Sequence, residues 1–367
     1  MDEERLFLLL RIGLGTTSPR DIDHSSLKGL SKHNWIELQH FVNRQGVSAI
    51  VYDGICSLID EYGLSSFCDD TNWFKFFLKK WQQLVEESYE ACNIKQLIVI
   101  NDIQERWQNE GIRMLLMKGM GLGTYYPIPQ HRASGDIDCY LFGEYTKGND
   151  VARSFADCVS EHWYKHSQIH YCGELIENHK SFVHTRGGRS SKKLNKVIVD
   201  SLNGVDFDVL PGTSVLLPPP MFNALFLTYH ALAHFLEEGL RLKQLLDWAM
   251  FLRRDASKLD WPAFYTCCET FHMRRFVEVA TDFAVNYLSI SLNDKTIITN
   301  NPYTSKVVHS TLYDDDFVFN SGKGVWANRW HIVRNTIKYR WKYHQIYQHT
   351  IIRQLWHYAY GYLFKSE

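Results

Sequence analysis

Two aspartates one residue apart, Asp136 and Asp138, are the side chains of this sequence best spaced to do chemistry. In an extended strand, alternate side chains point to the same face, so both carboxylates project together while Ile137 and Cys139 pack beneath them. Neighbouring carboxylates repel each other unless a cation lies between them, and Mg²⁺ is the usual ion, held by carboxylates and substrate phosphates. The alternative is an exposed edge strand that carries two acids for solubility. When the two aspartates are considered alone, this alternative is favoured.

A glycine turn precedes the aspartates. The apolar run "IRMLLM" predicts a buried strand that ends at Lys118 and Gly119, and "GMGLGTYY" predicts a short helix that Pro127 and Pro129 end. The glycines match neither the dinucleotide-binding fingerprint nor a Walker loop. A strand that leads through Lys-Gly into a helix still offers backbone N–H groups to a phosphate. The alternative is a plain strand-to-helix connection.

The order of these features is more informative than each alone. Strand, glycine turn, short helix, loop and a strand that begins with two acids resemble the nucleotidyltransferase core of the polymerase beta superfamily. The wording "LLMKGMGL…YYPIPQHRASGDIDCYL" is similar to an uncharacterised bacterial nucleotidyltransferase family with Lys-Gly, then Tyr-Pro, then Arg-x-x-Gly-Asp-Ile-Asp. The resemblance extends from the N-terminal helices to about residue 254. It gives the family's positions to Lys118, Gly119, Arg132, Ser134, Gly135, Asp136 and Asp138.

The resemblance implies roles for these residues. Asp136 and Asp138 bind Mg²⁺ or Mn²⁺, the turn at Lys118 and Gly119 binds the triphosphate, and the loop with Arg132, Ser134 and Gly135 supports the site. Many superfamily members have Ser or Gly directly after the turn glycine, where this sequence has Met120. A hydroxyl contact to the phosphate is therefore missing, and we expect backbone N–H groups and Lys118 to replace it.

A third acid completes the site in this superfamily, and two places compete for it. "LIENHKSF" resembles the family's strand with an acid, any residue and a histidine, which makes Glu177 the preferred candidate, with His179 on the same face. The alternatives are Asp206 and Asp208. The third acid would be a metal ligand or accept the proton of the attacking hydroxyl.

Later helices offer further candidates. His230 and His234 lie four residues apart on one helical face, but without a third ligand a half-buried pair is favoured over zinc. In "GLRLKQLLDWA", Arg241 is a candidate contact for a substrate phosphate, while Asp247 is expected to anchor the helix. A structural ion pair is the alternative for both residues. The basic, aromatic segment 329–365 predicts helices packed on the bundle, with binding of nucleic acid or lipid as the alternative.

The secondary structure along the chain indicates an α+β protein. We expect a nucleotidyltransferase-type mixed β-sheet core over 111–216, flanked by an N-terminal helical region over 1–110 and a C-terminal helical domain over 217–367. Within the core, 168–185 is expected to form one strand, 186–196 a polar loop and 197–210 a hairpin that turns near Asn203-Gly204.

Composition excludes some classes of protein. The 367 residues carry a net charge of -1 and are 45% hydrophobic, which is typical of a globular protein without a general attraction to nucleic acid or membranes. The 8 scattered cysteines, the absence of a signal peptide and the absence of a long apolar run indicate a soluble, cytoplasmic protein.

The sequence therefore predicts a metal-dependent nucleotidyltransferase. It would transfer a nucleoside monophosphate from an NTP, preferably ATP, to the hydroxyl or amine of an acceptor, more plausibly a small molecule than RNA. The alternatives are a catalytically inactive binding protein with the same fold and a nucleic-acid-binding module that acts through the C-terminal helices.

Overall fold

The computed structural model describes residues 2–161, 165–183, 188–237, 239–294, 296–314, 334 and 336–348, with residues 24 and 26 described by their backbone alone. The chain divides into two compact units. The first consists of Met1–Lys180, Asp206–Pro218 and Tyr287–Ser291, and the second of Ser181–Val205, Pro219–Asn286 and Leu292–Glu367. The predicted boundary between a helical region and an α/β core at residue 110 lies inside the first unit and stays a prediction.

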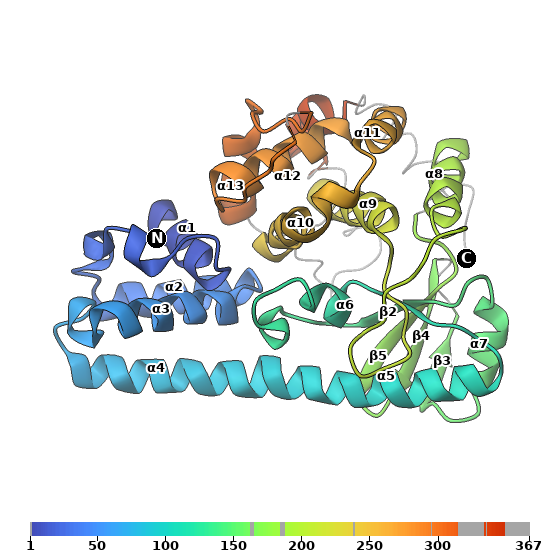
Figure 1. Ribbon diagram of the computed structural model, residues 1–367, viewed down its shortest axis with the longest axis horizontal. Coiled ribbons are helices and arrows are strands. Elements are labelled where there is room, and N and C mark those ends of the chain that lie inside the picture. The colour runs from blue at the N-terminus through green and yellow to red at the C-terminus, as the bar shows by residue number, and fades with distance from the viewer. Residues whose placement is uncertain are drawn as a thin grey trace. The chain divides into compact units, whose positions relative to one another are not determined.

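Helices form the N-terminal part of the first unit. A long rod consists of α4, a π-helical turn η4 and α5, with α1 to α3 near one end and the sheet near the other (Figure 1). Helices α1 and α3 meet at backbone distance, since a Cβ on Gly54 would lie 2.2 Å from the carbonyl oxygen of Leu9. The bounds are α1 Glu3–Gly13, α2 Lys32–Arg44, α3 Ser48–Tyr62, α4 Thr71–Val85, η4 Glu86–Glu90 and α5 Ala91–Asn109, with 3₁₀ turns η1 Pro19–Asp21, η2 His24–Leu27 and η3 Leu64–Ser66.

Five strands form one mixed sheet at the far end of the rod. Their order is β1-β2-β5-β4-β3, with β2 and β5 parallel and every other neighbouring pair antiparallel. Strand β2 is thus an interior strand, which excludes the exposed edge considered for Asp136 and Asp138. The mixed sheet flanked by helices confirms the predicted fold class. The strands are β1 Leu115–Met117, β2 Ile137–Tyr140, β3 Cys158–Ser160, β4 His166–Tyr171 and β5 Glu174–His179.

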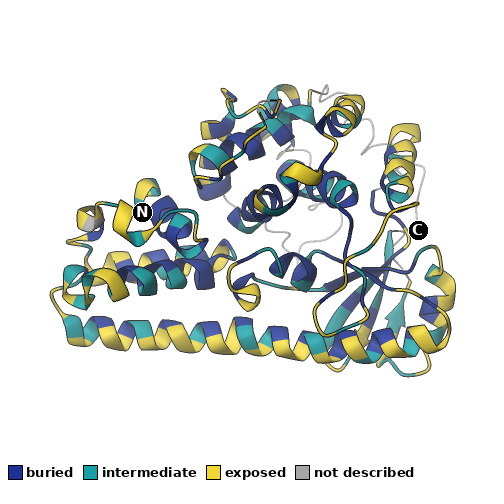
Figure 2. Ribbon diagram, in the orientation of Figure 1, coloured by how far each residue is buried: buried dark blue, intermediate teal, exposed yellow. Residues whose placement is uncertain are grey.

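One face of the sheet is covered by apolar side chains. Val99, Ile103 and Trp107 of α5 pack with Ile137 and Ile176 in one buried cluster. Along α4 and α5, exposed residues alternate with buried ones, as expected for helices that bury one side only (Figure 2). Because strand side chains alternate, the residues between these apolar ones point to the opposite face.

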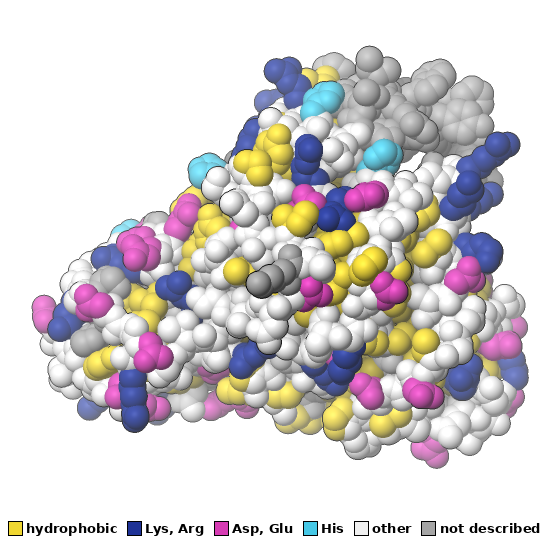
Figure 3. All heavy atoms as spheres, turned by 45° about the horizontal axis from the view of Figure 1, so that its top comes forward, with side chains coloured by type: hydrophobic (Ala, Val, Ile, Leu, Met, Phe, Trp, Pro, Cys, Tyr) yellow, Lys and Arg dark blue, Asp and Glu magenta, His cyan; other side chains and the backbone are white. Residues whose placement is uncertain are grey.

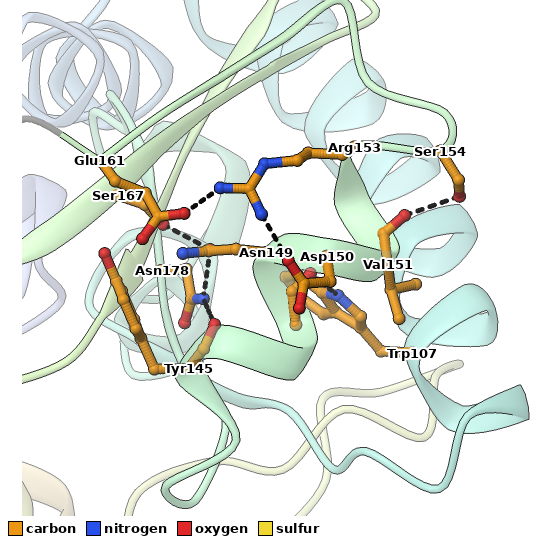
Figure 4. A network of polar contacts seen from close by, with 11 residues as sticks. Trp107, Tyr145, Asn149, Asp150, Val151, Arg153, Ser154, Glu161, Ser167 and Asn178 are labelled. Atoms are coloured by element: carbon orange, nitrogen blue, oxygen red, sulfur yellow. Dashed lines mark hydrogen bonds and ion pairs between the residues drawn. The ribbon is translucent and has the colours of Figure 1, made fainter.

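A polar network anchors the sheet to α7 (Tyr145–Ala152) (Figure 4). The side-chain amide of Asn178 on β5 donates to the Asn149 side chain at 2.8 Å and to the Tyr145 carbonyl at 3.2 Å. The Ser167 hydroxyl on β4 donates to the same Asn149 oxygen at 2.6 Å. Asn178 therefore points to the apolar face, which leaves Glu177 and His179 on the other face of β5.

The prediction of a single strand over 168–185 was wrong. Residues 168–179 belong to a hairpin, because β4 and β5 pair in register around Cys172 and Gly173, with His166 opposite His179. Residues 184–185 lie outside the described residues. Both turn residues have positive φ, 51° and 72°, as a two-residue hairpin turn of this hand requires. Glycine adopts this conformation readily and cysteine seldom does.

The predicted loop over 186–196 and hairpin over 197–210 were also wrong. Helix α8, Arg189–Asp200, includes residues of both predicted elements and buries Leu194 and Ile198, while 186–187 lie outside the described residues. Gly204 does adopt a positive φ of 68°, but it follows a helix instead of joining two strands. Residues 205–208 have no regular structure, and Val209 forms only an isolated bridge to Leu216.

The second unit is helical in its described parts. Besides α8 it contains α9 Pro220–Glu237, α10 Leu242–Asp255, η7 Ala256–Lys258, α11 Trp261–Thr270, α12 Arg274–Asn286, α13 Thr304–Tyr313 and the π-helical η8 Lys342–Tyr347. Much of the basic segment 329–365 lies outside the described residues. In its described part, Tyr343 and Ile346 are buried, and the Trp341 ring contacts Phe235 of α9. Among the described residues, no helix is both long and apolar enough to cross a membrane.

His131 connects the loop before β2 to the helices of the first unit. It ends the short turn η5, Pro129–His131, and its ring nitrogens contact Asp53 at 2.7 Å and Glu90 at 3.0 Å. Burial lowers the pKa of His131, but the two carboxylates outweigh it, so its pKa lies above the ordinary 6.5. Burial also raises the pKa of Asp53, which offsets part of the stabilisation that the charged pair provides. The protonated ring stabilises the fold, and this contribution is lost as pH rises through the folded pKa.

We predict that His131→Asn lowers the free energy of unfolding by about 2 kcal/mol at pH 6, because charge-assisted hydrogen bonds are lost. The difference from wild type should shrink as the pH rises above 6.5 and wild type loses its ring charge. Urea unfolding at several pH values measures this, with the exposed His170→Asn as control. A deficit that does not change with pH would contradict the role of the charged ring.

Candidate active site

The turn after β1 has a strained backbone. Lys118 has a φ of 49° and Gly119 a φ of 44°, and helix α6 (Gly119–Gly123) follows directly. A non-glycine residue in this region costs about 1 kcal/mol or more, so surrounding contacts must hold it. The Lys118 ammonium lies 2.9 Å from an oxygen of Asp138, which is one such contact. A Cβ on Gly119 would approach the Ser134 hydroxyl to 3.3 Å, so the turn touches the loop before β2.

The sheet register brings three carboxylates together. Asp138 on β2 lies opposite Glu177 on the parallel strand β5, and Asp136 directly precedes β2. Oxygens of Asp136, Asp138 and Glu177 all lie within 4.8 Å of one another. We call this set the carboxylate group. Asp206 and Asp208, the alternative third acids, are exposed and do not belong to it.

Basic side chains offset the charge on the buried member of this group. Asp138 is 2% exposed, and its two oxygens face Lys118 at 2.9 Å and the Nε2 atom of His179 at 2.9 Å. Burial alone would raise the pKa of Asp138, but Lys118 and His179 hold it below its ordinary value. Burial and the neighbouring Asp138 instead raise the pKa of Asp136. The two aspartates therefore differ in their readiness to take up a proton.

Two further basic residues, which the sequence did not predict, lie near these acids. The Nε2 atom of His166 lies 3.2 Å from Glu177, and burial lowers the pKa of His166. Burial, with the charge of Lys118, also lowers the pKa of Lys165. The two-residue turn at Cys172 and Gly173 was the available signal, since pairing around it places 166 opposite 179.

The loop before β2 is held from several sides. Arg132 is buried and donates from Nη1 to the Ala133 carbonyl at 3.0 Å, so it shapes the loop itself. The Gln96 side chain on α5 donates to the Gly135 carbonyl. The Ser134 hydroxyl oxygen is buried and has no hydrogen-bond partner among the described residues. A buried hydroxyl in this condition is costly unless a ligand or water satisfies it.

Met120 has a structural use in this fold. Its partly buried side chain packs against the apolar cluster beneath the sheet. A small polar residue at this position would give up that packing. This packing is a physical reason for a methionine after Gly119.

The remaining predicted residues belong to the second unit. His230 and His234 place their Nε2 atoms 3.2 Å apart, and no group of three potential metal ligands in the described part of the chain includes them. Arg241 is an exposed residue that precedes α10, where its backbone N–H donates to Gln244 at 2.8 Å. A role of Arg241 in nucleotide binding stays a prediction. Asp247 is buried within α10.

The mixed sheet, the turn after β1 and the acids on β2 and β5 define an α+β fold of the nucleotidyltransferase type. The chain matches the model of a family described as "Uncharacterised nucleotidyltransferase" over residues 31–289. This range is well over half of the chain and includes the turn and all three carboxylates, so the protein belongs to this family. No curated protein and no solved structure matches this chain.

Proposed function

We propose that this protein is a divalent-metal-dependent nucleotidyltransferase that transfers a nucleoside monophosphate from an NTP, with ATP the expected donor. The observation that carries the proposal is the carboxylate group, held within 4.8 Å beside the turn at Lys118 and Gly119. A hydroxyl or amine of the acceptor would attack the α-phosphorus, and pyrophosphate would leave.

The donor atoms of the carboxylate group fit Mg²⁺ or Mn²⁺. Asp136, Asp138 and Glu177 offer only oxygen, which both ions accept. The bound ion would neutralise the negative charge that develops on the phosphate oxygens. The Lys118 ammonium lies 2.9 Å from one Asp138 oxygen. Neutralising Asp138 would allow Lys118 to turn toward the triphosphate, in line with the phosphate-binding role expected for it.

Glu177 is our candidate for the third ligand or the general base. As a base it would take the proton of the attacking hydroxyl while the new O–P bond forms. Two imidazoles hold its carboxylate, with Nε2 of His166 at 3.2 Å and Nε2 of His179 at 3.5 Å. These contacts fix the direction in which the carboxylate points.

We favour a small molecule over RNA as the acceptor. Basic and acidic side chains are interspersed over most of the described surface that Figure 3 draws. An RNA-binding surface needs concentrated basic charge to contact phosphates. The net charge of -1 agrees with this preference.

The first prediction for this function is label transfer. Purified protein with labelled NTP and Mg²⁺ or Mn²⁺ should label one species in a cell extract, and Asp136→Ala or Asp138→Ala should reduce the rate by about 10³-fold, since several kcal/mol of charge stabilisation are lost. Glu177→Ala should have a similar effect, while the exposed Asp206→Ala should not. Transfer that survives Asp136→Ala would show that the carboxylate group is not the catalytic site. No transfer by wild type, with NTP still bound, would favour the inactive binding protein.

Ser134 is our candidate for the phosphate-binding hydroxyl that this chain lacks at Met120. Its Oγ atom is buried, has no partner among the described residues and lies beside the Gly119 turn. A phosphate oxygen bound at the turn would accept a hydrogen bond from it. The contact thus comes from the loop before β2 instead of from α6.

We predict that Ser134→Ala raises KM for the NTP about tenfold, because a hydrogen bond to a charged group contributes about 1.5 kcal/mol or more. A smaller effect on kcat is expected, since the hydroxyl binds the phosphate before and during reaction alike. Steady-state kinetics against the exposed Ser154→Ala control measure both constants. An unchanged KM would remove Ser134 from the phosphate site.

A further inference from the structure

A second group of possible metal ligands adjoins the carboxylate group. One ligand atom each from His166, Glu177 and His179 lies within 4.8 Å of the others. The register of the hairpin produces this group, because His166 lies directly opposite His179 while Glu177 is two residues before His179 on the same face. All three side chains come from regular strands, so the group is rigidly held.

The two imidazoles face the same carboxylate. Nε2 of His166 lies 3.2 Å from one oxygen of Glu177, and Nε2 of His179 lies 3.5 Å from the other. His179 is 1% exposed, and the side chains of His166 and Glu177 are each 14% exposed. The ring centroids are 5.3 Å apart. A ring nitrogen directed at a carboxylate oxygen repels it unless a proton or a shared cation lies between the nitrogen and the oxygen.

Ligand chemistry separates this group from the carboxylate group. Two imidazole nitrogens and one carboxylate suit divalent transition metals such as Mn²⁺, Fe²⁺, Co²⁺ or Zn²⁺, whereas Mg²⁺ prefers oxygen alone. We propose that His166, His179 and Glu177 form a transition-metal site next to the carboxylate group, with Glu177 shared between the two. The nearby Asp138 oxygen, 2.9 Å from His179, is available as a further ligand.

The site differs in selectivity from the one that the proposed function needs. Mg²⁺ in excess fills the oxygen-only group and leaves the histidine site to a transition metal. Metal binding there does not depend on NTP, on an acceptor or on catalysis. Metal binding at the histidine site can therefore be tested independently of the transferase activity.

Titration with Co²⁺ in excess Mg²⁺ tests the site directly. Co²⁺ bound by imidazole should give visible absorption bands in the full-length protein, and Zn²⁺ should abolish them by displacement while more Mg²⁺ should not. His166→Gln and His179→Gln should each weaken Co²⁺ binding by at least about 100-fold, more than loss of an outer-shell partner usually costs. The partly exposed His166→Gln decides the outcome if the buried His179→Gln does not fold by circular dichroism.

Two control variants complete the experiment. His170→Gln changes an exposed histidine of the same strand and should leave the spectrum and the affinity as in wild type. Asp136→Asn should lose NTP transfer yet keep the Co²⁺ bands, since Asp136 is outside the histidine group. Absence of Co²⁺ bands in folded wild type, or bands that both histidine variants retain, would overturn the proposal and leave the histidines as hydrogen-bond donors to the carboxylates.

Discussion

The parallel pairing of β2 with β5 imposes the constraint on which the site depends. It fixes Asp138 opposite Glu177. Asp136, the residue directly before β2, places its carboxylate close to both. Negative charge in a nearly buried position is costly unless cations compensate it. Lys118 and His179 each lie 2.9 Å from Asp138 and supply part of that compensation. The same carboxylates offer the oxygen ligands for the metal ion that we propose.

The other face of the sheet holds these strands in register. Ile137 and Ile176 pack against α5, and the hydrogen bonds of Asn178 to α7 orient β5. Since strand side chains alternate, each apolar or amide contact on that face fixes an acid or imidazole on the opposite face. The rod of α4 and α5 also reaches the loop before β2 through Gln96. Residues remote from the acids thus determine their geometry.

The elements around the acids could be predicted from the sequence, because short apolar runs bounded by glycine and a DxD pattern have strong local signals. The strand with Asp138 and the turn at Gly119 were found this way. The hairpin at Cys172 was missed because cysteine rarely adopts positive φ, so the turn lacked its usual residues. Without that turn, the approach of His166 to Glu177 could not be foreseen. Helix α8 was missed because its basic residues outnumber the few apolar ones that it buries.

We propose that the carboxylate group forms a divalent-metal site at the triphosphate. Anomalous diffraction from crystals grown with Mn²⁺ and a non-hydrolysable NTP analogue tests it most directly. We expect a Mn²⁺ peak at coordination distance from Asp136 and Asp138, with the triphosphate beside Gly119, and loss of that peak in Asp136→Asn/Asp138→Asn. A bound analogue with no Mn²⁺ at either aspartate would contradict it.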